Sequence, residues 1–382
     1  MATFSKASFN VASYASSRPK YPRSLYDFIF DFHKRSSRSG GKSARWDRAV
    51  DLGCGTGQAT VELTPFKHVI GVDPSETMVR VAREGLEAHR TQPSSPLDNS
   101  NDKTYETNTT PEPQIIEFVQ SSAENLGFLE NDSVDLVIAD LSGYDEFLRT
   151  DKFDVGVTVA QACHWFDWSK VWPEVGRVLR KGGSAAFWIY TEPRFPAYPH
   201  LTPLIEHYDK HTEDPSTSVG RYWQQPGRSI LSNHLLDVPE PSREILEPLE
   251  RVYFTGPYFP SLPPSHTRPI IMRETMRWVD FLGYLRTWSA LQTLKEHHPE
   301  DSLHPEGPLE VRFWNSLRRA AVQGSSGGNE GEEGDRGDHR GAHQNDVTMV
   351  DPESEVEVDR GVVLLLTRKV TEAWNSSGLL QF

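Results

Sequence analysis

Short apolar runs separated by amphipathic stretches organise the first half of the chain. Apolar residues fill 47–52, 68–73 and 115–119, and turn residues bound each run, which is typical of buried strands. Apolar positions recur at helical spacing over 25–32 and 78–86. Strands that alternate with helices in this way predict a parallel sheet with right-handed crossovers.

The fourth strand of this sheet has two candidates, Val134–Ala139 and Phe153–Ala160. Without residues 140–159, the first candidate strand would continue through Ala160 into the stretch Gln161–Phe166 as one uninterrupted sequence pattern. We interpret 140–159 as an inserted segment, which is either part of the mature chain or a retained intron. A helix at Val171–Leu179, a tight turn at Arg180–Gly183 and a fifth strand at Ser184–Tyr190 are predicted to follow.

The pattern changes after residue 190, where prolines and aromatic residues dominate. Helices are predicted at 201–210, 272–283 and 309–322, and strands at Glu250–Phe254 and Val362–Thr367. Trp223 and Trp288 are expected in the core of this cap region rather than against a ligand. The acidic tract 323–359 and the polar stretch Thr91–Gln114 contain too few apolar residues to pack, so we expect both to stay flexible.

These elements predict a single α/β architecture, a doubly wound Rossmann-like sheet of seven mostly parallel strands with helical cap insertions. We expect five regions along the chain. They are an N-terminal lid and helix (1–46), a core (47–190) with insertions at 91–114 and 140–159, a substrate cap with the sixth strand (191–322), a disordered acidic tract (323–360), and the last strand with the C-terminus (361–382).

Charge and cysteine content narrow the classes of function. The formal net charge is −14, and the tract 323–359 holds eleven acids against two arginines, so the remainder carries only −5. A nucleic-acid partner, which needs a basic face, is therefore not expected. No run of 18 apolar residues predicts a membrane span, and Cys54 and Cys163 provide neither a disulfide framework nor a metal site. We expect a cytoplasmic protein without a metal.

The candidate chemistry begins at the turn after the first strand. Gly53, Gly55 and Gly57 tolerate positive φ and let a ligand approach the backbone closely. Asp73 ends the second strand, 20 residues after Gly53, where a parallel sheet binds ribose hydroxyls. The spacing is not that of a dinucleotide site, and the carboxylate of Asp51 would repel a pyrophosphate but suits a cationic amino group.

Further polar residues fall at the ends of the third and fourth strands. Glu124 follows the strand 115–119, and the stretch Gln161–Phe166 follows the fourth strand. The carboxyl ends of parallel strands meet at one edge of a sheet, and ligands bind there. We therefore expect these residues to join the glycine turn and Asp73 in one site.

The stretch 49–57 resembles motif I of the S-adenosylmethionine (SAM) dependent methyltransferases. Four further stretches resemble the trans-aconitate methyltransferase-like group of the class I (type 11) enzymes. They are Tyr14-x-x-x-Arg-Pro-x-Tyr-Pro22, Gly71-Val-Asp-Pro-Ser-x-x-Met78, Gln161-Ala-Cys-His-Trp-Phe-Asp-Trp168 and Tyr284-Leu-Arg-Thr-Trp-Ser289. The likeness covers most of 8–190 and thins to scattered matches beyond.

This resemblance implies a SAM-dependent methyltransferase that acts on a small-molecule acceptor, with O-methylation of a carboxylate or hydroxyl as the favoured reaction. C-methylation of a quinone- or sterol-like ring is an alternative, and so is a non-catalytic SAM-binding regulatory protein. Carried over position by position, the residues that would bind SAM are Tyr14, Arg18, Asp51, Gly53, Gly55, Gly57, Asp73, Met78, Ala123, Glu124 and Gln161.

On the acceptor side, each candidate residue has a structural alternative. His164 is the candidate base or acceptor contact, and its alternative is to pack between Trp165 and the sheet. Trp165 itself would line the acceptor pocket or belong to the core. Arg221 and Arg286 would hold an acceptor carboxylate through a bidentate guanidinium, or they would form ion pairs within the protein.

Overall fold

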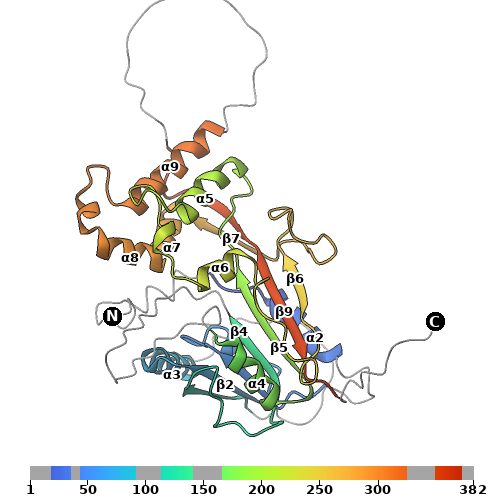
Figure 1. The fold of residues 1–382 in the computed structure, drawn as a ribbon. Helices are drawn as coiled ribbons and strands as arrows, with labels where there is room; N and C mark the ends of the chain where they lie inside the picture. Colours follow the sequence, from blue (N-terminus) through green and yellow to red (C-terminus); the bar gives the residue numbers. More distant parts are fainter. Residues whose placement is uncertain (1–18, 36–43, 92–112, 141–165, 325–348, 372–382) are drawn as a thin grey trace, which may run out of the picture.

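A computed structural model describes residues 19–35, 44–91, 113–140, 166–324 and 349–371 of the chain. The strands of this part form one seven-stranded sheet, in the order β3-β2-β1-β4-β5-β9-β6, and a separate two-stranded sheet of β7 and β8. The large sheet crosses the lower half of the molecule, and a group of helices lies above it (Figure 1).

Apolar strands build the large sheet, and the first five described strands run parallel to one another. They are β1 (Arg48–Leu52), β2 (His68–Asp73), β3 (Ile115–Gln120), β4 (Val134–Asp140) and β5 (Leu179–Tyr190). The strand β9 (Val362–Arg368) lies antiparallel between β5 and β6 (Glu250–Phe254). The predicted seven-stranded, mostly parallel α/β sheet is confirmed. The first candidate for the fourth strand is β4, and the second candidate lies outside the described residues.

Helices cover both faces of this sheet. The core helices are α2 (Arg23–Arg35), α3 (Glu76–Thr91) and α4 (Trp168–Val178). Phe187 of β5 packs edge-on against Trp168 of α4, with ring centroids 5.5 Å apart, whereas Trp188 packs against Tyr26 of α2 at 6.2 Å. Neighbouring residues of a strand point to opposite faces. The two helices therefore lie on opposite sides of β5, as in a doubly wound fold.

The cap lies beyond the carboxyl end of β5 (Figure 1). Its helices are α5 (Thr202–Lys210), α6 (Gly227–Ser232), α7 (Trp278–Leu285), α8 (Ser289–His297) and α9 (Leu309–Gly324), with short 3₁₀ turns at Pro199–Leu201, Gly220–Tyr222 and Pro299–Leu303. Stacked aromatic rings join these helices, as between Tyr208 of α5 and Phe313 of α9, whose centroids are 3.8 Å apart. Trp223 and Trp288 are buried in this core, as predicted.

The helix predicted at 272–283 is half wrong. Met272–Arg277 forms the strand β7, and α7 begins only at Trp278. The residues of β7 pair antiparallel with β8 (Glu355–Arg360), so a partner about eighty residues away in sequence decides their conformation. Helical spacing of apolar residues carries no information about such a distant partner.

The end of the tract 323–360, expected to be disordered, is ordered. Residues 349–360 are described, and β8 buries the side chain of Asp359 completely. The Asp359 carboxylate accepts hydrogen bonds from Nε and Nη2 of Arg273, at 2.6 and 2.8 Å, and from the Tyr258 hydroxyl at 2.6 Å. These charge-assisted bonds supply the stabilisation that the few apolar residues of this segment do not.

One local prediction near the sheet also needs correction. The tight turn expected at 180–183 lies inside β5, where the register against β4 shifts between Val134 and Leu136. The extra residues are accommodated as a bulge, with Gly182 at a positive φ of 78°. Beyond the glycine turn, Thr60–Glu62 forms a single 3₁₀ turn.

A close packing contact at Gly71 of β2 gives a testable prediction. A Cβ added at Gly71 would lie 2.5 Å from the Phe118 ring and 3.0 Å from Sγ of Cys54. We expect Gly71→Ala to lower the free energy of unfolding by about 1–3 kcal/mol through overpacking. The matched control is Gly85→Ala on α3, where a Cβ would meet no atom within 4 Å and where we expect a gain of about 1 kcal/mol. Urea denaturation measures both, and equal effects would contradict the packing argument.

Candidate active site

The glycine turn and Asp73 meet at the carboxyl edge of β1 and β2. The two strands are in register, with Leu52 opposite Val72, and the Gly53 N–H donates to the Val72 carbonyl at 2.7 Å. The backbone at Gly53, Gly55 and Gly57 has positive φ values of 70°, 53° and 85°. Residues with a side chain rarely adopt this conformation, so the glycines allow the chain to turn tightly over the end of the sheet.

The Asp73 carboxylate is buried under this turn and held by backbone donors. Its Oδ2 accepts from the Gly55 N–H at 2.9 Å, and its Oδ1 accepts from the Ser75 N–H at 2.8 Å. Burial raises the pKa of Asp73 to about 7, although both hydrogen bonds favour the ionised form. Each oxygen retains a further lone pair, so the carboxylate is oriented and can still accept bonds from a ligand.

Asp51, the penultimate residue of β1, is also buried. The Thr60 hydroxyl donates to its Oδ2 at 2.6 Å. Its Oδ1 is buried without a hydrogen-bond partner among the residues that the structure describes. Burial, with smaller contributions from the charges of Asp140 and Asp73, raises the pKa of Asp51 to about 8. A buried acceptor without a donor is costly, and a cationic donor would relieve that cost.

A third carboxylate stands at the end of β4. Asp140 accepts a hydrogen bond of 2.6 Å from the Tyr21 hydroxyl. Both residues line a cavity of about 170 Å³, together with Tyr26 of α2 and with Gln58 and Glu62 beyond the glycine turn. The acids Asp51, Asp73 and Asp140 therefore gather at one edge of the sheet, which is negative when they are ionised.

The residues expected near an adenine lie on α3 and after β3. The side chains of Met78 and Ala123 are buried, each with 5% of its surface exposed. Glu124 is partly buried, and its Oε1 accepts from the Asp167 N–H at 3.1 Å. This bond joins the end of β3 to the residue that caps α4. The expected site residues outside the described part of the chain are Tyr14, Arg18, Gln161, His164 and Trp165.

The two arginines expected to hold an acceptor carboxylate lie in the cap and do not meet at one site. Nε of Arg286 is 3.4 Å from Oε1 of the buried Glu310, which matches the ion-pair alternative. The carboxylate of Glu310 also accepts a 2.8 Å bond from Nζ of Lys295. Arg221 lies on the 3₁₀ turn Gly220–Tyr222 with an exposed side chain.

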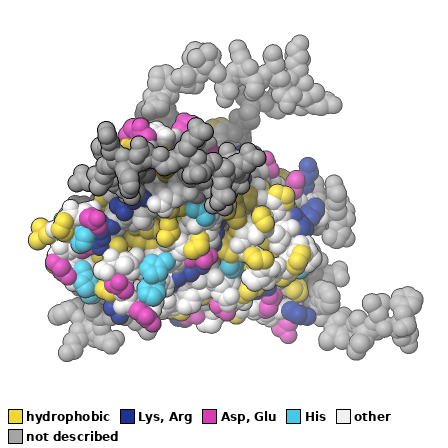
Figure 2. All heavy atoms as spheres, turned by 90° about the horizontal axis from the view of Figure 1, so that it is seen from above, with side chains coloured by type: hydrophobic (Ala, Val, Ile, Leu, Met, Phe, Trp, Pro, Cys, Tyr) yellow, Lys and Arg dark blue, Asp and Glu magenta, His cyan; other side chains and the backbone are white. Residues whose placement is uncertain are grey.

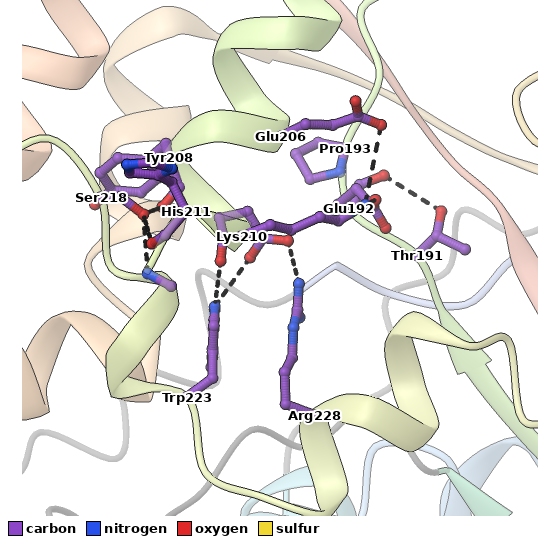
Figure 3. Close-up of polar contacts among 12 residues, drawn as sticks. Thr191, Glu192, Pro193, Glu206, Tyr208, Lys210, His211, Ser218, Trp223 and Arg228 are labelled. Atoms are coloured by element: carbon purple, nitrogen blue, oxygen red, sulfur yellow. Dashed lines mark hydrogen bonds and ion pairs between the residues drawn. The ribbon is translucent and has the colours of Figure 1, made fainter. Parts of the chain in front are cut away.

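Sequence reasoning missed a buried ion network directly beyond β5. Figure 3 shows Glu192 beside Lys210, and the side chain of Arg228 pointing from α6 toward the same cluster. Nζ of Lys210 is 2.6 Å from Oε1 of Glu192, and Arg194 reaches Glu206 at 3.1 Å. Burial opposes ionisation of Glu192, but the charges of Lys210 and Arg194 lower its pKa to about 2. Its position just after a predicted strand was the signal that could have identified it.

Asp209 anchors the other half of this network. Its carboxylate, 1% exposed, pairs with Arg228 and also accepts a 3.1 Å bond from the Trp223 indole N–H. The Arg228 guanidinium lies 4.7 Å from the centroid of the Trp223 ring. The cations beyond β5 are thus neutralised by acids of the same cap.

Membrane-spanning helices and metal-ligand clusters are both absent from the described residues. No described helix has the length and apolar character needed to cross a bilayer. No three metal-ligating side chains of that part of the chain gather in one place, so the expectation of no metal site stays a prediction.

Comparison with known proteins shows that the chain is similar to methyltransferases. A model of the methyltransferase domain matches residues 50–144, which contain the glycine turn, Asp73 and β4. A Saccharomyces cerevisiae protein named as an S-adenosylmethionine-dependent methyltransferase is 27% identical over 297 residues, covering 76% of this chain and 82% of the relative. A Dictyostelium discoideum protein named as a methyltransferase is 26% identical, covering 73% of this chain and 74% of the relative.

The chain is a SAM-dependent methyltransferase. Among solved structures, a protein of Anaeromyxobacter dehalogenans named as a type II methyltransferase superposes with a TM-score of 0.51 at 21% identity. The match covers 93% of this chain and 99% of that one, and it supports the shared fold. The enzyme class, the fold and the cofactor expected from the glycine turn are confirmed.

The residues at the carboxyl edge of this methyltransferase fit SAM. The unpartnered Oδ1 of Asp51 would accept from the cofactor's ammonium, and the negative edge suits its sulfonium. A Cβ at Gly55 would meet no atom of the described residues within 4 Å. When bound, SAM supplies an electrophilic methyl group. The chain's residues orient the cofactor and the acceptor.

Proposed function

We propose that this methyltransferase methylates an oxygen of a small organic molecule, and that the acceptor is a hydroxyl. The resemblance to the trans-aconitate group favours a carboxylate acceptor, whereas the charges of the described site favour a neutral one. Asp51, Asp73 and Asp140 place three carboxyl groups at this edge, which repel an anionic acceptor when ionised and offer it no cationic partner when protonated. Arg194, Lys210 and Arg228 beyond β5 are already paired with acids. This charge distribution is the observation that carries the proposal.

The proposed roles of the site residues follow their chemistry. Asp51 and the glycine turn would hold the methionine part of SAM, and Asp73 would accept bonds from the two ribose hydroxyls. Met78, Ala123 and Glu124 would bracket the adenine. From the resemblance, Tyr14 and Arg18 would cover the cofactor, and Gln161 would lie beside the sulfonium.

A hydroxyl acceptor sets a requirement that a carboxylate acceptor does not. An alcohol or phenol keeps its proton near neutral pH, so transfer is aided by a general base close to the acceptor oxygen. We propose His164 for this role, and Trp165 for the wall of the acceptor pocket. Most of the rate enhancement would come from holding the acceptor in line with the transferred methyl group. A cytoplasmic location and the lack of a nucleic-acid partner are part of the same proposal.

Methyl-labelled SAM tests the acceptor class. The purified chain is incubated with labelled SAM and separate pools of phenols and alcohols, of carboxylic acids, and of quinones. We expect label in the hydroxyl pool, as ethers that resist alkaline hydrolysis. Label in carboxylic acids, released as methanol by alkali, would overturn the hydroxyl assignment. Label on ring carbon, identified by NMR, would support the C-methylation alternative instead.

A second experiment tests the location of the cofactor. We expect Asp73→Ala to weaken SAM binding by at least about 10- to 100-fold, because even one charge-assisted hydrogen bond to the ribose contributes about 1.5–3 kcal/mol. The control is Asp47→Ala, which removes an acid from the opposite, amino-terminal edge of the same sheet, where it pairs with Arg45 and Lys67. Titration calorimetry gives both dissociation constants. An unchanged constant for Asp73→Ala would remove Asp73 from the site.

A further inference from the structure

Asp140 is a carboxylate that the proposed chemistry does not use. Asp51 lies opposite Ile138 in the parallel pair of β1 and β4, so Asp140 stands two positions further along, level with the beginning of the glycine turn. It is the last residue of β4, and it is half-buried. Its place on the strand beside Asp51 puts a second negative charge against the same end of the cofactor site.

The Tyr21 hydroxyl fixes the orientation of this carboxylate. It donates a 2.6 Å hydrogen bond to Oδ1 of Asp140. The Tyr21 ring is itself held edge-on against Trp188, with centroids 5.6 Å apart, and it lies 6.2 Å from the ring of Tyr190. Because both rings belong to β5, the sheet positions the tyrosine and the tyrosine positions the acid. Such a bond also stabilises the ionised form of the acid.

The acids near the cavity all raise the pKa of the buried Tyr26. Burial raises the pKa of the Tyr26 hydroxyl, and the negative charges of Asp140, Asp51 and Glu62 raise it further. The three acids therefore lie close enough to Tyr26 to act on its hydroxyl, and two of them, Asp140 and Glu62, line the cavity. The cavity that Tyr21, Tyr26, Glu62 and Asp140 line measures about 170 Å³, and Lys20 contributes one cation to the same lining. Charges that face a confined, partly buried volume are screened less than charges on an open surface.

The two forms of the cofactor differ by one positive charge. SAM carries an ammonium, a carboxylate and a sulfonium, whereas the product S-adenosylhomocysteine (SAH) has a neutral thioether in place of the sulfonium. A carboxylate that contacts only the ammonium would favour both forms equally. A carboxylate near the sulfur would favour SAM alone, because the Coulomb attraction disappears when the methyl group leaves.

We propose that Asp140, oriented by Tyr21, selects the charged cofactor over its neutral product. The inference rests on the proposed position of SAM over Asp51 and Asp73. It makes Asp140 a specificity residue, whose carboxylate attracts the sulfonium and loses that attraction after transfer. Tyr21 is a positioning residue that acts through Asp140. The product SAH then dissociates readily, and inhibition by product is weak.

Binding of three ligands to the full chain tests this proposal by calorimetry. The ligands are SAM, SAH and sinefungin, which carries an amine in place of the sulfonium group. For Asp140→Asn we expect SAM and sinefungin to bind about tenfold more weakly, which corresponds to about 1.4 kcal/mol, and SAH to change less than about twofold. The matched control is Asp47→Asn, which removes the same charge at the far edge of the sheet and is expected to leave all three constants unchanged.

A second variant keeps the test informative if Asp140→Asn folds poorly. Tyr21→Phe leaves the carboxylate and removes only its orienting bond, so the SAM-to-SAH preference is expected to fall by about threefold with an unchanged melting temperature. Equal weakening of SAM and SAH in either folded variant, or an unchanged preference in both, would overturn the proposal. Failure of the underlying site assignment has a different signature, namely unaltered SAM binding in Asp73→Ala.

Discussion

Asp51→Asn is expected to weaken SAM binding by about 100-fold and, at pH 8, to raise the melting temperature by several degrees. The loss of affinity follows from removing the charge that would meet the cofactor's ammonium. The gain in stability follows from removing a carboxylate that is buried with one oxygen unpartnered among the described residues. This one substitution therefore measures both the stability that Asp51 costs the protein and the SAM affinity that it provides.

The pH dependence of this effect has a definite sign. The folded pKa of Asp51 is about 8, far above the ordinary 3.8 of the unfolded chain. Between these values the folded protein retains a proton that the unfolded chain releases, so the free energy of unfolding falls as pH rises, by about 1.4 kcal/mol per pH unit for this group. The loss is complete above pH 8 and absent below about pH 4. The asparagine variant lacks this slope.

Thermal denaturation from pH 5 to pH 9 measures the difference between the two proteins. The control is Asp47→Asn, because hydrogen bonds from Lys67 and Arg45 lower the pKa of Asp47, and its removal is expected to cost stability at neutral pH. Cofactor binding to the unsubstituted enzyme should release a proton below pH 8, which calorimetry in buffers of different ionisation enthalpy detects. Parallel stability profiles for Asp51→Asn and the unsubstituted protein would refute the argument.

The second large effect expected is a loss of about 3–5 kcal/mol in the free energy of unfolding for Asp209→Ala. The substitution leaves Arg228, whose side chain is 10% exposed, without its buried counter-ion. It also removes the acceptor of one bond from the Trp223 indole, although that N–H still donates to the Asp209 carbonyl at 2.8 Å. Removing one partner of a buried ion pair costs far more than the pair itself contributes, because the remaining charge stays desolvated.

A double-mutant cycle distinguishes the stranded charge from lost packing. We expect Asp209→Leu together with Arg228→Met to recover most of the stability that either single substitution loses. Urea denaturation of the four proteins gives the coupling energy. A double variant as unstable as the sum of the single variants would mean that the ion pair is not the cause. Arg80, which pairs with Glu84 on the exposed face of α3, offers a control whose replacement should cost less than about 1 kcal/mol.

The core of the fold could be predicted because its signals are local. The strands at 68–73 and Glu250–Phe254 appear at the predicted residues, and helices α5 and α9 lie within one or two residues of their predicted bounds. Apolar runs, helical spacing and glycine turns depend on neighbouring residues only. The position of the site followed from the same information, because strands that alternate with helices must run parallel and expose their carboxyl ends together.

The failures share a dependence on distant partners. Nothing in the sequence around Met272 indicates a strand partner at Glu355–Arg360, and the acidic composition of that segment argues against order. The pairing of Asp359 with Arg273 explains why this acidic segment is nevertheless ordered. A buried carboxylate that accepts two hydrogen bonds from a guanidinium stabilises the fold. The network of Glu192 and Lys210 was missed for the same reason. Composition counts charges, but only three-dimensional contacts show which of them are paired.

Asp140, the last residue of β4, is also the first residue of the segment 140–159. The preference for SAM over SAH would therefore depend on whether that segment is present. A message without codons 140–159 would encode Ala160 directly after Ala139, so the carboxylate and its bond to Tyr21 would disappear together. The two protein forms would share the glycine turn and Asp73 but would differ in their sensitivity to SAH. Processing of the transcript would then act as a control on product inhibition, in addition to determining which segment is translated.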